Sequence, residues 1–167
     1  MDSLKKSKSV SRSGFAGLFK QAPKKAAEGL DTTLPKHLEA QGAQVARYGQ
    51  QVRQLAGSGQ YAEALETARQ RLSLSEQTYG TEHILTATCL NDVATFVQAY
   101  GQFDEAEVLF ERASKLQRKL LGDVHPHSIA TLQNLVSLYG AKGDAVKEEG
   151  MKFLVQALQA SAGAQSS

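Results

Sequence analysis

Apolar side chains recur every three to four positions along most of the chain, which is the spacing of one buried face of an α-helix. Four such stripes cover residues 61–79, 85–97, 103–120 and 129–139. Pro126 stands where the first turn of a helix tolerates proline. Continuous apolar runs and β-branched clusters typical of strands are rare, so the pattern predicts an all-α protein.

Helices are also expected before and after these stripes. The first would run over about residues 36–57, after the helix-start signal around Asp31 and Pro35. The last would cover about residues 145–159. Its inward side chains are predicted to be Phe153, Leu154, Ala157 and Leu158. The six predicted helices would pair as three hairpins.

Two motifs return after a fixed interval of 42 residues. The segment Gly59–Ala64 returns as Gly101–Ala106, and Tyr79–His83 returns as Leu121–His125. A unit of this length is typical of a helical hairpin that cannot bury its apolar face alone and stacks on copies of itself. The interval therefore predicts a right-handed α-solenoid, with hairpins over about residues 36–80, 83–122 and 126–159.

Charge divides the chain into two parts. Residues 1–27 hold seven Lys or Arg and one acidic residue, whereas the remainder holds 12 basic and 16 acidic residues. Serines alternate with lysines in this basic part, so residues 1–34 are expected to be a disordered arm with a short amphipathic patch over residues 15–22. Residues 161–167 are expected to be a disordered tail.

Three interpretations of the arm stay open. It can be a solvated tail, a weak tether to anionic membranes through residues 5–25, or an organelle transit peptide. The tether would use Phe15, Leu18 and Phe19 as a shallow wedge. Nucleic-acid binding is not expected, because few aromatic residues interleave with the basic ones. We expect a cytoplasmic protein, with an organelle-targeted or membrane-peripheral location as the alternative.

The middle of the chain resembles the tetratricopeptide repeats of kinesin light chains. The resemblance rests on four segments within about residues 43–158, namely Leu90–Ala94, Gly101–Glu107, Phe110–Ala113 and Leu121–Pro126. That family has repeats of the length found here, so the resemblance implies a solenoid of tetratricopeptide hairpins. The heptad coiled coil of the family is absent before residue 36, which favours a protein that shares only the repeat module.

Catalytic chemistry has little support in the sequence. Cys89 lies in an apolar stripe, where a free cysteine behaves as a small hydrophobe. His83 and His125 hold the same position in successive repeats, so we expect their imidazoles to bond backbone groups between hairpins rather than to bind a metal. No phosphate-binding loop or nucleophile motif is visible, and we expect a protein that is not an enzyme and has no cofactor.

The resemblance implies a binding groove lined by the first helix of each hairpin. The candidate groove residues are Arg53 and Gln54 in the first hairpin, Thr88, Asn91, Asp92 and Thr95 in the second, and Gln133, Asn134 and Ser137 in the third. Amide side chains can donate to and accept from the backbone of an extended peptide at the same time. Since Arg53 is the one basic residue of this set, clamping of a terminal carboxylate is not expected.

These observations predict a non-enzymatic adaptor that binds a partner peptide or helix in the groove. One alternative is a structural subunit of a larger complex or a homodimer, joined through an apolar edge around Phe153 and Leu154. Another is a membrane-tethered regulatory protein that acts through the basic arm.

Overall fold

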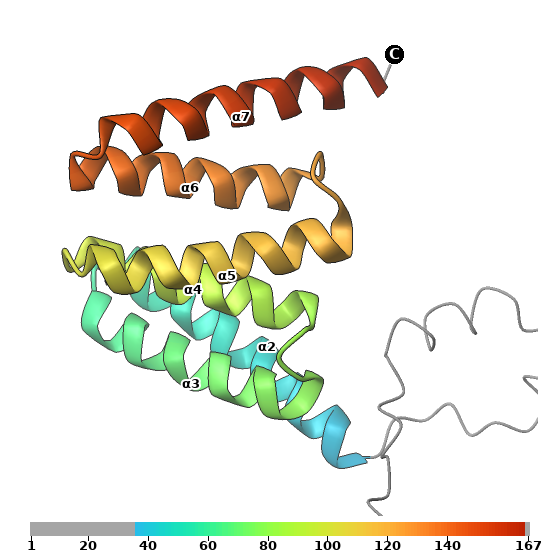
Figure 1. The fold of residues 1–167 in the computed structure, drawn as a ribbon. Coiled ribbons are helices and arrows are strands. Elements are labelled where there is room, and N and C mark those ends of the chain that lie inside the picture. The colour runs from blue at the N-terminus through green and yellow to red at the C-terminus, as the bar shows by residue number, and fades with distance from the viewer. Residues whose placement is uncertain (1–35, 166–167) are drawn as a thin grey trace, which may run out of the picture. The chain divides into compact units, whose positions relative to one another are not determined.

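The computed structural model describes residues 36–165, and over this range it consists of α-helices joined by short turns (Figure 1). The all-α prediction is confirmed. The expected basic arm, with its patch over residues 15–22, lies outside the described residues. The helices are α2 (Lys36–Gly57), α3 (Tyr61–Tyr79), α4 (Ile84–Ala99), α5 (Phe103–Leu121), α6 (Pro126–Lys142) and α7 (Ala145–Gln165).

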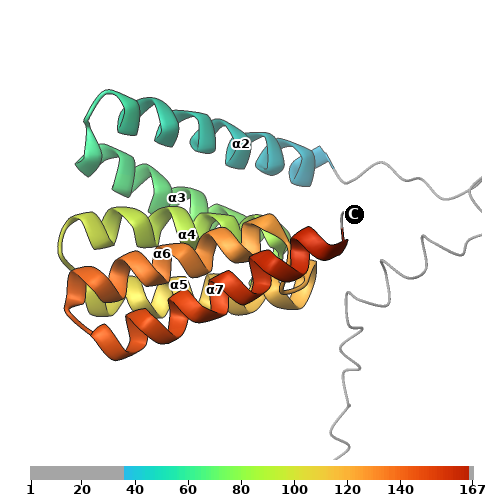
Figure 2. The same ribbon diagram turned by 90° about the horizontal axis from the view of Figure 1, so that it is seen from above.

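The helices form three antiparallel hairpins, α2–α3, α4–α5 and α6–α7, and each helix packs on the next one in the chain. Figures 1 and 2 show the hairpins stacked one on another. In addition, α4 and α6 approach each other directly. This is the predicted solenoid.

Glycine closes each hairpin turn because the backbone there has a positive φ. Gly101 has φ 76° and Gly143 has φ 77°, in a region that side chains with a Cβ rarely adopt. The Gly101 N–H donates to the carbonyl oxygen of Gln98, and the next N–H donates to that of Val97. Such paired bonds satisfy the last carbonyls of α4 and end it.

Histidine begins the first helix of the second and third hairpins. The Nδ1 atom of His83 accepts the N–H of Leu85, and that of His125 accepts the N–H of His127, both at 3.2 Å. These bonds satisfy N–H groups that have no partner inside a helix. The two imidazoles therefore bond backbone groups as expected, but each bond lies within the start of the helix that the histidine caps rather than between hairpins.

Small residues lie in the buried core between the helices. Ala64, Ala94, Ala106 and Ala113 are all completely buried. Next to them Phe110 is also completely buried, and the largest core cluster extends from α2 to α7. The hydrophobic core is therefore continuous through the three hairpins.

Helix α7 differs from the sequence prediction in two ways. Phe153 is 75% exposed and Ala157 is also exposed, so neither is inward; the buried face of this helix is formed by Val155 with Met151, Leu154 and Leu158 beside it. Residues 161–165, expected in a disordered tail, continue the helix to Gln165, since the alanine-rich sequence there favours helix. Tyr61, expected in a buried stripe of α3, is also 53% exposed.

Helix α7 has polar residues at positions where the equivalent residues of α5 are buried. Helix α5 packs between α4 and α6, whereas α7 packs on α6 alone. Glu148 and Lys152, which form an ion pair at 2.7 Å, stand 42 residues after the buried Ala106 and Phe110. This substitution suits a helix whose outer side meets water, as in the terminal unit of a repeat array.

Glu107 joins the second and third hairpins electrostatically. Its carboxylate accepts from Lys142 Nζ at 2.5 Å and from Lys147 Nζ at 2.7 Å. These hydrogen bonds lower the pKa of Glu107 to about 2. The ionised carboxylate therefore favours the folded state.

We predict that Ala106→Leu destabilises the protein by about 1–3 kcal/mol, because the larger side chain overpacks a completely buried position. Urea unfolding followed by circular dichroism measures the change. The matched control is Ala130→Leu at an exposed position of α6, with an expected change within about 0.5 kcal/mol. Equal unfolding midpoints for Ala106→Leu and wild type would contradict close packing at Ala106.

The stabilising effect of Glu107 is predicted to depend on pH. Its pKa is about 2 in the folded state against 4.5 for the unperturbed group, so the stabilisation is complete above pH 4.5 and is lost as pH falls towards 2. The free-energy difference between wild type and Glu107→Gln should therefore shrink over this range in urea titrations. Glu149→Gln, at a 78% exposed side chain, serves as control. A difference for Glu107→Gln that is the same at every pH contradicts the prediction.

Candidate partner-binding face

The predicted groove residues lie on the first helices of the three hairpins. They are distributed over α2 (Arg53, Gln54), α4 (Thr88, Asn91, Asp92, Thr95) and α6 (Gln133, Asn134, Ser137). We call the side of the stack formed by α4 and α6 the α4–α6 face. Since α4 and α6 contact each other, the candidate residues of the second and third hairpins lie near one another.

Two asparagines form the centre of this face. Asn91 Oδ1 accepts from Asn134 Nδ2 at 2.9 Å and from Thr131 Oγ1 at 3.2 Å. Both asparagines are half-buried, and Thr131 is buried. The hydrogen bonds fix the orientation of both amides, because the shared oxygen accepts from both donors.

The two amides retain one free donor and one free acceptor. Within the described part of the chain, Asn91 Nδ2 and Asn134 Oδ1 make no hydrogen bond. Neither atom is buried without a partner, so each is open to water or to a bound molecule. The pair thus presents an N–H group and an oxygen from two neighbouring helices.

Other candidate residues of the face are only partly available. The hydroxyls of Thr88 and Thr95 donate to the backbone oxygens of Ile84 and Asn91 in their own helix. Ser137 Oγ accepts from Gln98 Nε2 at 3.4 Å, which joins α4 to α6 a second time. The exposed candidates without such a hydrogen bond are Arg53, Gln54 and Gln133.

Asp92 belongs to an internal ion pair. Its Oδ2 atom accepts from Arg71 Nη1 at 2.6 Å, and the Arg71 side chain, 8% exposed as a residue, also donates from Nε to the carbonyl oxygen of Val45. Burial raises the pKa of Asp92, while Arg71 and Arg53 oppose this shift. Arg71 therefore connects α2, α3 and α4, and the Asp92 carboxylate is not freely offered to a ligand.

The sequence prediction missed Arg71. Its guanidinium lies against Gly49, where an added Cβ would come within 2.9 Å of the guanidinium carbon. The signal was present in the repeat, because Arg71 stands where the next hairpin has the buried Ala113. A charged residue at a position where the repeat has alanine indicates a buried partner, here Asp92.

Among the described residues, no helix is long and apolar enough to cross a membrane. The same residues contain no group of three or more His, Cys, Asp or Glu side chains placed to hold a metal ion. Cys89 is buried, and burial raises the pKa of its thiol. The polar side chains of the α4–α6 face are thus mainly amides and hydroxyls.

Comparisons with known proteins agree with this architecture. A family model described as tetratricopeptide repeat matches residues 48–119. The mitochondrial tetratricopeptide repeat protein 19 of Homo sapiens is 35% identical over 86 residues, which cover 52% of this chain and 22% of that protein. Its Mus musculus counterpart is 31% identical over 86 residues. The chain thus matches less than a quarter of the length of these relatives.

Solved structures also match the fold. The TPR-like repeats of a putative kinesin light chain from Podosopora anserina align with a TM-score of 0.63 and 28% identity, over 70% of this chain and 56% of that one. BtubC (BKLC) from P. vanneervenii aligns with a TM-score of 0.69 and 18% identity, over 90% of this chain and 59% of that one, which shows a shared fold alone. The chain is therefore similar to tetratricopeptide repeats over residues 48–119, and its fold is similar to that of kinesin light chain repeats.

Proposed function

We propose that the domain is a non-enzymatic adaptor that holds an extended segment of a partner protein on its α4–α6 face. Tetratricopeptide repeats generally mediate protein–protein interactions, which supports the class of function. The observation that supports the location is the free donor on Asn91 and the free acceptor on Asn134. An extended peptide presents carbonyl and N–H groups that match such a pair.

Preorganisation supports the same proposal. Asn91 and Asn134 are already held by each other and by Thr131, so little side-chain freedom is lost when a peptide binds. The exposed Thr95 and Gln133 add polar groups beside them. Because these groups are neutral, the bound segment would be recognised mainly through its backbone.

A clamp for a terminal carboxylate is not part of the proposal. Arg53 is the one basic residue among the candidates, and its charge already acts on the half-buried Asp92 carboxylate. Recognition of a terminal carboxylate needs several convergent basic groups. The partner segment is therefore proposed to be internal and extended.

A second candidate function is assembly through α7. Phe153 is 75% exposed and Val146 is 85% exposed, seven residues apart on this helix and therefore on the same side. Exposed apolar side chains at this spacing favour packing against another protein or a second copy. Light scattering over a range of protein concentrations distinguishes this function, since the adaptor needs no self-association.

The location proposed for the adaptor is the cytoplasm. The matched relatives are named as mitochondrial, which supports organelle targeting as the alternative. The segment predicted to tether the protein to a membrane, residues 5–25, lies outside the described residues.

We predict that the double variant Asn91→Ala/Asn134→Ala loses its partners in affinity capture from the native cell, with helicity unchanged. Removing two hydrogen bonds to a peptide weakens binding by about tenfold or more. Captured proteins are quantified against wild type by mass spectrometry.

The matched control is Gln70→Ala/Gln77→Ala, which removes two amides from exposed positions of α3. Its captured proteins should equal those of wild type. Retention of every partner by the asparagine variant would place the binding site elsewhere.

A further inference from the structure

The two junctions between hairpins carry different side chains at equivalent positions of the repeat. Between the second and third hairpins, Lys142 Nζ pairs with Asp104 Oδ1 at 2.6 Å and with Glu107 Oε2 at 2.5 Å. The equivalent residues between the first and second hairpins, 42 positions earlier, are Tyr100, Ala62 and Leu65. The first junction therefore has an aromatic ring and two apolar side chains where the second has an ion-paired lysine.

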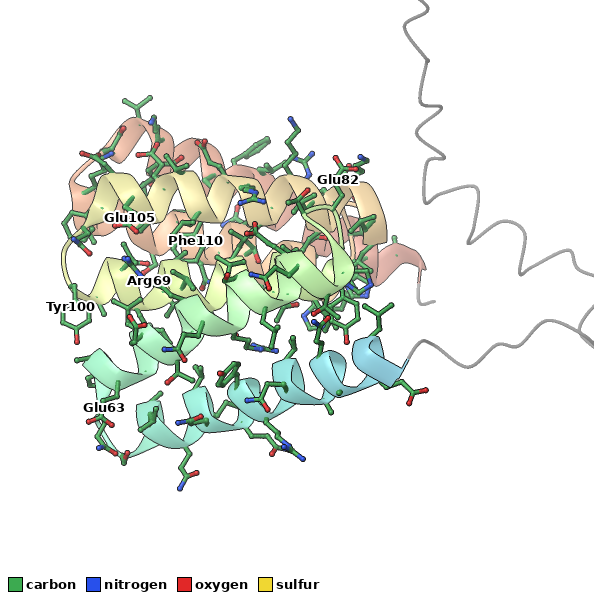
Figure 3. All side chains as sticks on the ribbon, turned by 90° about the horizontal axis from the view of Figure 1, so that it is seen from below. Glu63, Arg69, Glu82, Tyr100, Glu105 and Phe110 are labelled. Carbon is green, nitrogen blue, oxygen red and sulfur yellow. The ribbon has the colours of Figure 1, made fainter. Side chains whose placement is uncertain are left out.

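A hollow of about 510 Å³ lies at this first junction. Side chains of α3, of the residue that ends α4 and of the turn that follows it form its lining. The lining residues are Ala62, Leu65, Glu66, Arg69, Tyr100 and Gln102. Figure 3 shows Tyr100 at the end of α4, where its side chain is 49% exposed as a residue. The hollow thus offers an accessible aromatic ring beside apolar side chains.

Carboxylates outnumber cations around this hollow. Arg69 is the one basic residue of the lining, and its Nη2 atom is already paired with Glu105 at 3.0 Å, on the neighbouring helix α5 (Figure 3). Glu66 is exposed and makes no ion pair with any residue of the described range. Glu63, three residues earlier in α3, is also exposed and likewise makes no ion pair within that range. Negative charge is therefore left unneutralised beside the hollow.

The second junction contains a cation that the first one lacks. Lys147 Nζ lies 5.1 Å from the centre of the Tyr139 ring and pairs with Glu107 at 2.7 Å. A cation placed between an aromatic face and a carboxylate is attracted to both. The residue equivalent to Lys147 in the first junction is Glu105. A ring and a free carboxylate are thus present in the first junction without the cation that would join them.

We propose that this hollow docks an arginine side chain from a basic segment of a partner protein. The guanidinium group stacks on the Tyr100 ring and pairs with Glu66, while its methylene groups lie against Ala62 and Leu65. Arginine fits better than lysine because its planar group stacks on aromatic faces and binds a carboxylate through two parallel hydrogen bonds. The site is separate from the asparagine pair of the α4–α6 face and does not depend on it.

Selection of a random dodecapeptide library on the full chain tests the proposal, with counter-selection on Tyr100→Lys. This variant places in the hollow the residue that the second junction has at the same position, so it repels a basic segment. Peptides enriched on the wild type over the variant are expected to contain arginine and to carry net positive charge. Enrichment of acidic or neutral peptides, or equal enrichment on both proteins, would overturn the proposal.

Fluorescence anisotropy with one enriched, labelled peptide gives the second measurement. Glu66→Lys reverses the charge that pairs with the arginine, so it should weaken binding by about tenfold or more. The matched control Glu39→Lys makes the same change of net charge at an exposed position near the start of α2, and it should change the affinity by less than about twofold. Equal weakening by the two variants would show attraction to net charge alone, against the proposal.

Variants of Tyr100 test the aromatic contact. Tyr100→Phe keeps the ring and should keep the affinity, whereas Tyr100→Ala should weaken binding by about fivefold. Equal affinities for Tyr100→Ala and wild type would contradict stacking. Binding by Asn91→Ala/Asn134→Ala should equal that of wild type, whatever role those asparagines have. Loss of binding in the asparagine variant but not in Glu66→Lys would assign the peptide to the α4–α6 face and refute the proposal.

Two other occupants would give different results. A wild-type dimer in sedimentation that dissociates in Glu66→Lys would show that the hollow binds a second copy, against the proposal. Residues 1–27 hold seven Lys or Arg against one acidic residue, so the chain's own basic segment is the other alternative. Tighter peptide binding after its Lys5, Lys6, Lys8 and Arg12 are changed to Gln would favour that segment and contradict the proposal. A monomer with unchanged peptide affinity agrees with it.

Discussion

Each hairpin of this domain depends on its neighbour to cover its apolar face. Helix α5 lies between α4 and α6, and its completely buried Ala106 and Phe110 belong to one core cluster with Leu132, Leu135 and Leu138 of the third hairpin. Small residues at the contact points let the helices approach closely enough to exclude water. This mutual burial determines both the interval of the repeat and the places where polar groups can remain accessible.

Polar groups take part in the same packing wherever the repeat departs from its pattern. Arg71 replaces an alanine of the repeat and is accommodated by Gly49 on one side and Asp92 on another. Asn91 reaches across to Asn134, so α4 and α6 are joined by an amide pair rather than by apolar side chains alone.

The helices and the repeat were predictable from the sequence because they depend on local periodicity. The apolar spacing of α3 to α6 and the recurrent glycines required no knowledge of distant contacts. The prediction that Phe153 is buried was wrong. Helix α7 has a neighbour on one side only, so an apolar residue there does not have to be buried. Likewise, the spacing of Asn91 and Asn134 indicated a shared face, but their hydrogen bond, and the pairing of Arg71 with Asp92, depend on how the hairpins meet.

The central claim is that the hairpins are stable only when stacked. Far-ultraviolet circular dichroism of an isolated third hairpin, residues 124–165, tests it most directly. The account predicts that this fragment loses most of its helical signal per residue, because Leu132, Leu135 and Leu138 lose the second hairpin that helps to cover them. A fragment that keeps the helical signal per residue of residues 36–165 would contradict it.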